Sequence, residues 1–198
     1  MRMELYSILL LFAGQLDGIK LSDILVSVFL ALLITFVYEI TCMVKRKQRS
    51  VLYLILLFLS ILYFEITILI TIIRREPGTS YHSGKIVPYF QWGVINGDVY
   101  GQRQFFYNLL NVFLFIPIGF MLKGLEQKAS GLKDDAMTAL TGFLISFCIE
   151  LLQIITKRGT FEITDILTNF IGTCLGIIIY ELLKRLFRHE RSKKQNIN

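Results

Sequence analysis

Long apolar runs separated by shorter polar connections dominate the chain. A helix of about 20 predominantly apolar residues can cross the hydrocarbon core of a bilayer. The runs lack the sustained alternation of apolar and polar residues that a membrane β-barrel shows. We therefore predict an all-α, polytopic membrane helical bundle of about five transmembrane helices, folded as a single integral membrane domain. The predicted spans are residues 24–44, 51–73, 105–122, 136–156 and 163–183 of the domain 1–198.

A further apolar segment near the N-terminus, residues 5–13, is too short to span a bilayer and is followed by Gly14 and Asp17. One interpretation is a signal peptide, but Arg2 alone would form its basic region and no A-x-A-like cleavage site follows. We instead predict a short interfacial or re-entrant segment.

The composition supports lipid as the main solvent. Hydrophobic residues make up 54% of the chain and charged residues only 18%, whereas soluble domains have roughly 25% charged residues. The net charge of +6 would suit nucleic-acid binding only if the basic residues lined one polar surface. They cluster between apolar runs, so we expect no nucleic-acid partner.

The distribution of Lys and Arg predicts the orientation. Residues 45–49, 123–135 and the tail from Lys184 carry four, three and six basic residues, which is thirteen of the 21 in the chain. Lys and Arg are retained on the cytoplasmic side. We therefore expect a cytoplasmic C-terminus, with residues 74–104 and 157–162 external. The longer external connection contains five aromatic residues, and we expect it to form a structured cap at the membrane interface.

Ionisable groups inside spans are costly and are functional candidates by default. Glu65, Glu150 and Asp165 all fall in the predicted outer half of the membrane. Polar partners follow at helical spacing, so that one polar cluster is expected to converge from three helices. A guanidinium such as that of Arg158, held between Glu150 and Asp165, would offset the cost of burying two carboxylates. The candidate substrate-binding residues are Asn108, Asn111, Glu150, Gln153, Arg158, Asp165 and Asn169.

Two interpretations of this cluster remain open at the level of sequence. Its side chains either bind a ligand or only hydrogen-bond helix to helix and fix the packing. If chemistry occurs, Glu150 and Asp165 are the candidate catalytic pair, one acting as the acid. Gly172 and Gly176 form a small-xxx-small pair that predicts a closely packed neighbouring helix. The sequence has no P-loop, G-x-S-x-G, H-E-x-x-H or dinucleotide-binding motif, and we expect no cofactor and no metal.

Two of these polar segments carry a family resemblance. The run from Asn108 to Phe120 contains N-x-x-N followed by P-x-G, and the run from Glu150 to Gly176 contains E-x-x-Q, Arg158, D-x-x-x-N and two glycines in order. Together with the weaker match Ile86-Val-Pro-Tyr-Phe90, they resemble the VanZ family of small bacterial membrane proteins. The resemblance covers about residues 80–183.

The resemblance implies a place in the bacterial cytoplasmic membrane and an association with resistance to teicoplanin-type glycopeptide antibiotics. Joined to the predicted external position of the polar cluster, it suggests action at the outer face on a membrane lipid or a lipid-linked envelope precursor. The alternatives are a membrane enzyme that uses a buried Glu/Asp pair on a lipid-linked substrate, and a non-catalytic partner of envelope machinery. The family brings no agreed catalytic residues, and whether a reaction is catalysed stays open.

Overall fold

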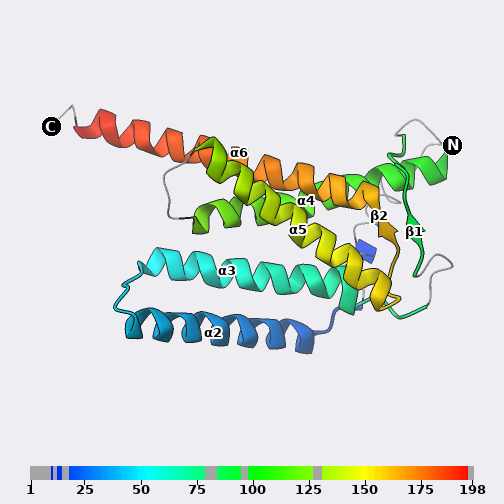
Figure 1. Ribbon diagram of the computed structural model, residues 1–198, viewed down its shortest axis with the longest axis horizontal. Coiled ribbons are helices and arrows are strands. Elements are labelled where there is room, and N and C mark those ends of the chain that lie inside the picture. Colours follow the sequence, from blue (N-terminus) through cyan, green and yellow to red (C-terminus); the bar gives the residue numbers. More distant parts are fainter. Residues whose placement is uncertain are drawn as a thin grey trace.

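A computed structural model describes residues 10, 13, 14, 18–78, 84–94, 98–126 and 131–195, with side chains as far as Arg188. Its long elements are five helices, each with a window long and apolar enough to cross a membrane, so the predicted all-α membrane bundle is confirmed (Figure 1). The elements are α2 (Leu21–Val44), α3 (Val51–Ile68) with its π-helical continuation η1 (Leu69–Ile73), β1 (Ile86–Val87), α4 (Val99–Leu125), α5 (Leu132–Ile155), β2 (Phe161–Glu162) and α6 (Ile163–Gln195).

Two boundaries differ most from the sequence prediction. Helix α4 begins at Val99, so that residues 99–104 of the predicted connection are helical. The Asp98 side chain accepts a hydrogen bond from the backbone N–H of Gly101 at 2.8 Å and caps this end. Helix α6 continues to Gln195, well past the predicted span. The predicted interfacial segment 5–13 lies largely outside the described residues.

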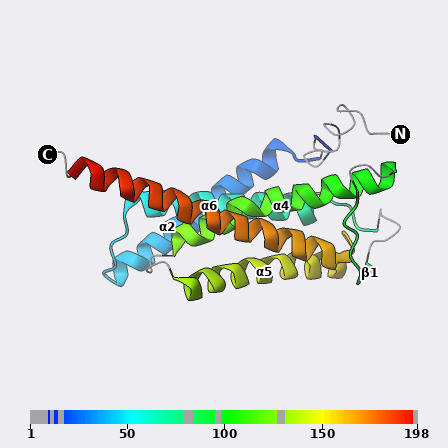
Figure 2. The same cartoon turned by 90° about the horizontal axis from the view of Figure 1, so that it is seen from above.

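The α2–α3 hairpin lies along one side of a group formed by α4, α5 and α6 (Figures 1 and 2). A side-chain contact joins the two helices near their connection, since the hydroxyls of Tyr38 and Tyr53 are 3.3 Å apart. A small apolar core joins α3 and η1 to the second group, and its buried members are Ile72, Phe115, Ile118 and Ile149.

The closest helix pair is α4 with α6, which touch backbone to backbone. A Cβ atom added to Gly172 would lie 2.3 Å from the Val112 carbonyl oxygen, and one added to Gly176 would lie 2.1 Å from that of Ile116. Distances this short leave no room for any side chain. The small-xxx-small prediction is therefore confirmed, because α4 is the close neighbour that these glycines admit.

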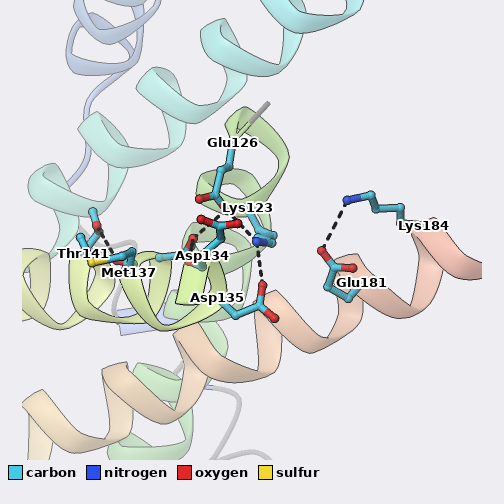
Figure 3. A network of polar contacts seen from close by, with 9 residues as sticks. Lys123, Glu126, Asp134, Asp135, Met137, Thr141, Glu181 and Lys184 are labelled. Carbon is cyan, nitrogen blue, oxygen red and sulfur yellow. Dashed lines mark hydrogen bonds and ion pairs between the residues drawn. The ribbon is translucent and has the colours of Figure 1, made fainter. Parts of the chain in front are cut away.

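A buried ion cluster joins α4 to α5 at the end of the bundle remote from the strands (Figure 3). The ammonium of Lys123, only 2% exposed, lies 2.7 Å from Glu126 Oε2 and 2.6 Å from Asp135 Oδ1. The Thr138 hydroxyl donates to the same Glu126 oxygen at 3.2 Å. Because the partners stand on either side of the α4–α5 connection, this lysine clamp fixes where α5 starts relative to the end of α4.

The long connection between α3 and α4 is tied to the turn between α5 and α6. The backbone N–H groups of Gly78 and Gly84 donate to the carbonyls of Lys157 and Gly159, at 2.9 and 2.8 Å. Further along, β1 pairs in parallel with β2, with Ile86 opposite Phe161. These bonds hold the described part of the connection against the end of the bundle, which we call the strand end.

Candidate functional site

A cavity of about 950 Å³ opens at the strand end of the bundle, among η1, the α3–α4 connection, α4 and the α5–α6 turn. We call it the polar cavity, because most of the side chains that line it are polar. Among the described residues these include three arginines, three carboxylates, three tyrosines and four amides: Arg74, Arg75, Arg158, Glu76, Glu162, Asp165, Tyr89, Tyr100, Tyr107, Gln91, Gln104, Asn111 and Gln153.

Asp165, in the first turn of α6, is the carboxylate at which the polar groups converge. Its carboxyl group interacts with the Asn111 side chain of α4 and, electrostatically, with Arg75 and Glu162. Both Asn111 and Asp165 line the polar cavity. The predicted convergence of α4 and α6 at these two side chains is therefore present in the structure.

Glu150 of α5 stands behind the wall of the polar cavity and is only 1% exposed. Its Oε2 atom accepts a hydrogen bond from the backbone N–H of Glu162 at 2.9 Å. Asp165, Glu162 and Arg75 lie close enough to interact with it electrostatically. Glu150 thus holds strand β2 in place from beneath the cavity, while Asp165 faces the cavity itself.

Arg158 takes a different position from the one expected. Its guanidinium donates to the backbone carbonyls of Ile72 and Ile73 at the end of η1. The Ile72 carbonyl also accepts a hydrogen bond from the Arg75 N–H at 3.2 Å. No ion pair within 4 Å joins Arg158 to Glu150 or Asp165 in the described part of the chain. The expectation of Arg158 between the two carboxylates was wrong, because the exposed carbonyls of η1 engage it instead.

Gln153 and Gly159 bring the α5–α6 turn against η1. The Gln153 amide donates to the Thr71 carbonyl at 3.4 Å and lines the polar cavity. A Cβ atom on Gly159 would lie 2.8 Å from Gln153 Oε1 and 3.0 Å from Arg75 Nη1. Because Gly159 has no side chain, Arg75 and Gln153 can approach the turn closely.

Asn108 supports the site from outside the cavity lining. Its Nδ2 atom donates to the carbonyls of Gln91 and Trp92, both at 2.8 Å. On the other side of the same segment, the backbone N–H of Gln91 donates to the Thr164 hydroxyl at 2.9 Å. Asn108 of α4 and Thr164 of α6 together fix the segment of the connection that carries Tyr89 and Gln91 into the cavity wall.

Asn169 lies one turn deeper in α6 and does not line the polar cavity. It is buried, and its Nδ2 atom donates to the Ser146 hydroxyl of α5 at 2.9 Å. Its Oδ1 atom has no hydrogen-bond partner among the described residues. In this arrangement Asn169 joins α5 to α6 rather than facing the cavity.

Comparison with known proteins adds a family to this geometry. The model of the VanZ/LLP1 family matches residues 50–184, which is more than half of the chain. The chain belongs to the VanZ/LLP1 family. Protein VanZ of Enterococcus faecium is 32% identical to it over 84 residues, 42% of this chain and 48% of that protein. The chain thus matches about half the length of this VanZ relative. No solved structure matches it.

The family model covers the segments that form most of the polar cavity. The two runs with VanZ-like motifs, in α4 and from α5 into α6, provide both Asn111 and Asp165 of the polar cavity and the glycines of the α4–α6 contact. The match also begins at residue 50, so it includes α3 and η1. That part of the VanZ/LLP1 region brings Arg74 and Arg75, which directly follow η1, to the cavity.

The sequence prediction missed several residues of the cavity wall. Arg74 and Arg75 follow a predicted span directly, and such a basic pair is usually a membrane-flanking feature. The sequence signal that could have identified them is the Arg-Arg pair itself, because it stands at the start of a long connection rich in aromatic residues. Tyr107, one turn before Asn111 in α4, could have been found by the same i, i+4 rule that joined Asp165 to Asn169.

In the described chain no group of three or more His, Cys, Asp and Glu side chains is arranged to hold a metal ion.

Proposed function

We propose that this protein acts at the outer face of the bacterial cytoplasmic membrane and binds the polar part of a lipid-linked envelope precursor in the polar cavity. Through this binding it lowers susceptibility to teicoplanin-type glycopeptide antibiotics. The observation that carries the proposal is the position of the cavity, which combines guanidinium, carboxylate and amide groups at one end of a membrane bundle.

Two features support a ligand that enters from the interface. Four aromatic residues of the strand end, Tyr89, Phe90, Trp92 and Tyr100, are half or more exposed, and aromatic rings are favoured at the level of lipid head groups. The strand end also lies opposite the end that carries most of the Lys and Arg residues. By the positive-inside rule, the polar cavity then opens to the outside.

The chemistry of the lining suits a head group with both anionic and hydrogen-bonding parts. Guanidinium groups bind phosphate and carboxylate through forked donors, and Arg74, Arg75 and Arg158 line the same cavity. Carboxylates and amides accept and donate hydrogen bonds to hydroxyl and amide groups. A phosphate-bearing, sugar- or peptide-containing precursor presents both kinds of group.

A membrane enzyme is the second candidate, and the electrostatic interaction of Asp165 with Glu150 and Glu162 favours it. Of the predicted pair, Asp165 lines the polar cavity whereas Glu150 is buried behind it. A reaction in the cavity would therefore use Asp165 together with Glu162, and Glu150 would position β2. Turnover of a lipid-linked precursor by the purified protein distinguishes this candidate from binding alone.

Drug susceptibility of matched cells with and without the gene tests the proposal. We expect the gene to raise the inhibitory concentration of teicoplanin by fourfold or more, with a smaller change for vancomycin and none for an unrelated envelope drug. Arg75→Gln and Asp165→Asn should remove the effect at unchanged protein abundance. Arg103→Gln is the matched control, because Arg103 is exposed in α4 and does not line the cavity. Equal protection by all variants would contradict the assignment of the site.

A further inference from the structure

A second cavity lies between the α2–α3 hairpin and the α4–α5 pair, in the membrane-spanning part of the bundle. Its volume is about 490 Å³ and its lining is almost wholly apolar. Residues of four helices contribute, among them Ile34 of α2, Ile61 and Phe64 of α3, Met121 of α4 and Ile145 of α5. We call it the apolar cavity. None of its lining residues is shared with the polar cavity.

The apolar cavity arises from the way the helices diverge. Helix α5 contacts the α2–α3 hairpin chiefly through η1, at the strand end. Away from that contact α5 runs obliquely and separates from α3 (Figure 1). Helix α3 keeps its contact with α4 along this stretch, where the Tyr63 hydroxyl donates to the Leu114 carbonyl at 2.9 Å. The apolar cavity lies in the region where α3 and α5 diverge, and Ile145 is its lining residue from α5.

One ionisable carboxyl group, that of Glu65, lies in the wall of this apolar space. Its Oε2 atom is buried and has no hydrogen-bond partner among the described residues. The other polar side chains of the wall are satisfied within the protein: Tyr63 by Leu114, and Ser60 by the Leu56 carbonyl at 2.6 Å. Glu65 is thus the polar group of the described wall that is left for a ligand.

We propose that the apolar cavity binds one long-chain amphiphile, whose chain fills the space and whose head group donates a hydrogen bond to Glu65. A polar group in hydrocarbon without a partner is costly, and each intramembrane carboxyl needs one. A lipid tail alone would cover the apolar wall but leave Glu65 Oε2 unpartnered, so a donor group is part of the required chemistry. The volume falls within the roughly 300–1,000 Å³ of small-molecule sites. This inference is independent of the function proposed for the polar cavity.

The test uses the full chain in lipid nanodiscs and two probes that differ only at the head group. One is hexadecanol with a photoactivatable diazirine on its chain, and the other is the methyl ether of the same molecule, which cannot donate. We expect hexadecanol to cross-link to peptides that contain residues 57–65 and 118–125, at least fivefold more than the ether does. Equal labelling by both probes, or labelling no greater than on the lipid-facing side of α2, would overturn the proposal.

Three variants identify the cavity as the origin of the labelling. Glu65→Leu should abolish the preference for hexadecanol over the ether, and Ile61→Trp should fill the space and lower labelling by both. The matched control is Leu33→Trp, because Leu33 is exposed on α2 and does not line the cavity. Thermal unfolding of each variant in the same nanodiscs checks that the bundle is intact. Full hexadecanol preference in folded Glu65→Leu protein would exclude the proposed hydrogen bond.

Discussion

The Glu150 carboxylate of α5 and the backbone N–H of Glu162 are joined by a hydrogen bond of 2.9 Å. This bond links a residue inside the bundle to the strand that precedes α6. A buried N–H that loses its acceptor costs about 1–3 kcal/mol. The Glu150 side chain is thus placed to hold the floor of the polar cavity, whatever its part in ligand binding.

Replacing Glu150 should therefore loosen β2. In Glu150→Leu we expect backbone amide hydrogen exchange around Glu162 to be about tenfold faster or more, since about 1.4 kcal/mol corresponds to a factor of ten. Glu150→Gln keeps an acceptor oxygen and should exchange at nearly the wild-type rate. The measurement is hydrogen exchange followed by mass spectrometry. Unchanged exchange in Glu150→Leu would show that β2 does not depend on this bond.

Variants at Asn108 and Asn111 should distinguish a residue that holds the α3–α4 connection from a residue that lines the polar cavity. Asn108→Leu removes both donors to Gln91 and Trp92, so residues 84–94 should become accessible to protease. Asn111→Leu removes a cavity-lining partner of Asp165 and should leave this segment protected while lowering drug protection. Limited proteolysis and drug susceptibility are measured on the same membranes. The distinction fails if both variants behave alike in both assays.

The α4–α6 contact should not accept even a methyl group. In Gly176→Ala the new Cβ would lie 2.1 Å from the Ile116 carbonyl oxygen, so the two helices must move apart. Overpacking commonly costs about 1–3 kcal/mol, and we expect less folded protein and a lower unfolding midpoint in detergent. Gly131→Ala is the control, since its nearest neighbour would be 3.7 Å away. Equal stability of the two variants would argue against the close contact.

The lysine clamp should stabilise the bundle more than an ion pair within one helix. Lys123→Met leaves Glu126 and Asp135 without their buried partner, and breaking such a pair costs about 3 kcal/mol or somewhat less, because Asp135 is 34% exposed. Lys184→Met removes a 3.6 Å pair with Glu181 and a cation–π contact with the Tyr180 ring along α6, each worth about 1 kcal/mol or less. Thermal unfolding compares the two. A larger loss of thermal stability in Lys184→Met than in Lys123→Met would contradict the stronger contribution of the lysine clamp.

Cysteine labelling tests the proposed orientation. In a background without Cys42, Cys148 and Cys174, single cysteines at Lys85 or Val94 should react with an impermeant thiol reagent on intact cells. Cysteines at Gln48 or Lys133 should react only after permeabilisation. All four positions are exposed, so access to the side chain does not limit the reaction. The reverse pattern would place the polar cavity on the cytoplasmic side.

The helices were predictable because length and apolarity alone define a membrane span, and both are local properties of the sequence. The start of α4 was not predictable, since it depends on the cap that Asp98 provides seven residues before the apolar run begins. The two strands could not be predicted from the sequence either. Each has two residues, too few for any periodicity, and they pair across a large separation in the chain.

The candidate site was predictable where a polar residue interrupts an apolar run, as at Asn111 and Asp165. It was not predictable where a polar residue lies in a connection, because there polarity carries no information about depth or direction. Arg75 faces the carboxylates and Arg158 turns to the end of η1, although both are basic residues beside a span. Only the position of the Ile72 and Ile73 carbonyls at the end of η1 distinguishes them.

The pairing of β1 with β2 has a consequence for biosynthesis. β1 and the arginines that follow η1 leave the ribosome early, but their partner strand and Asp165 arrive only with the last span. Until α6 has been inserted, the α3–α4 connection has no strand to pair with and α4 has no glycine face to pack against. The polar cavity is thus completed only after α6, because a nascent chain that stalls before this helix lacks both β2 and Asp165.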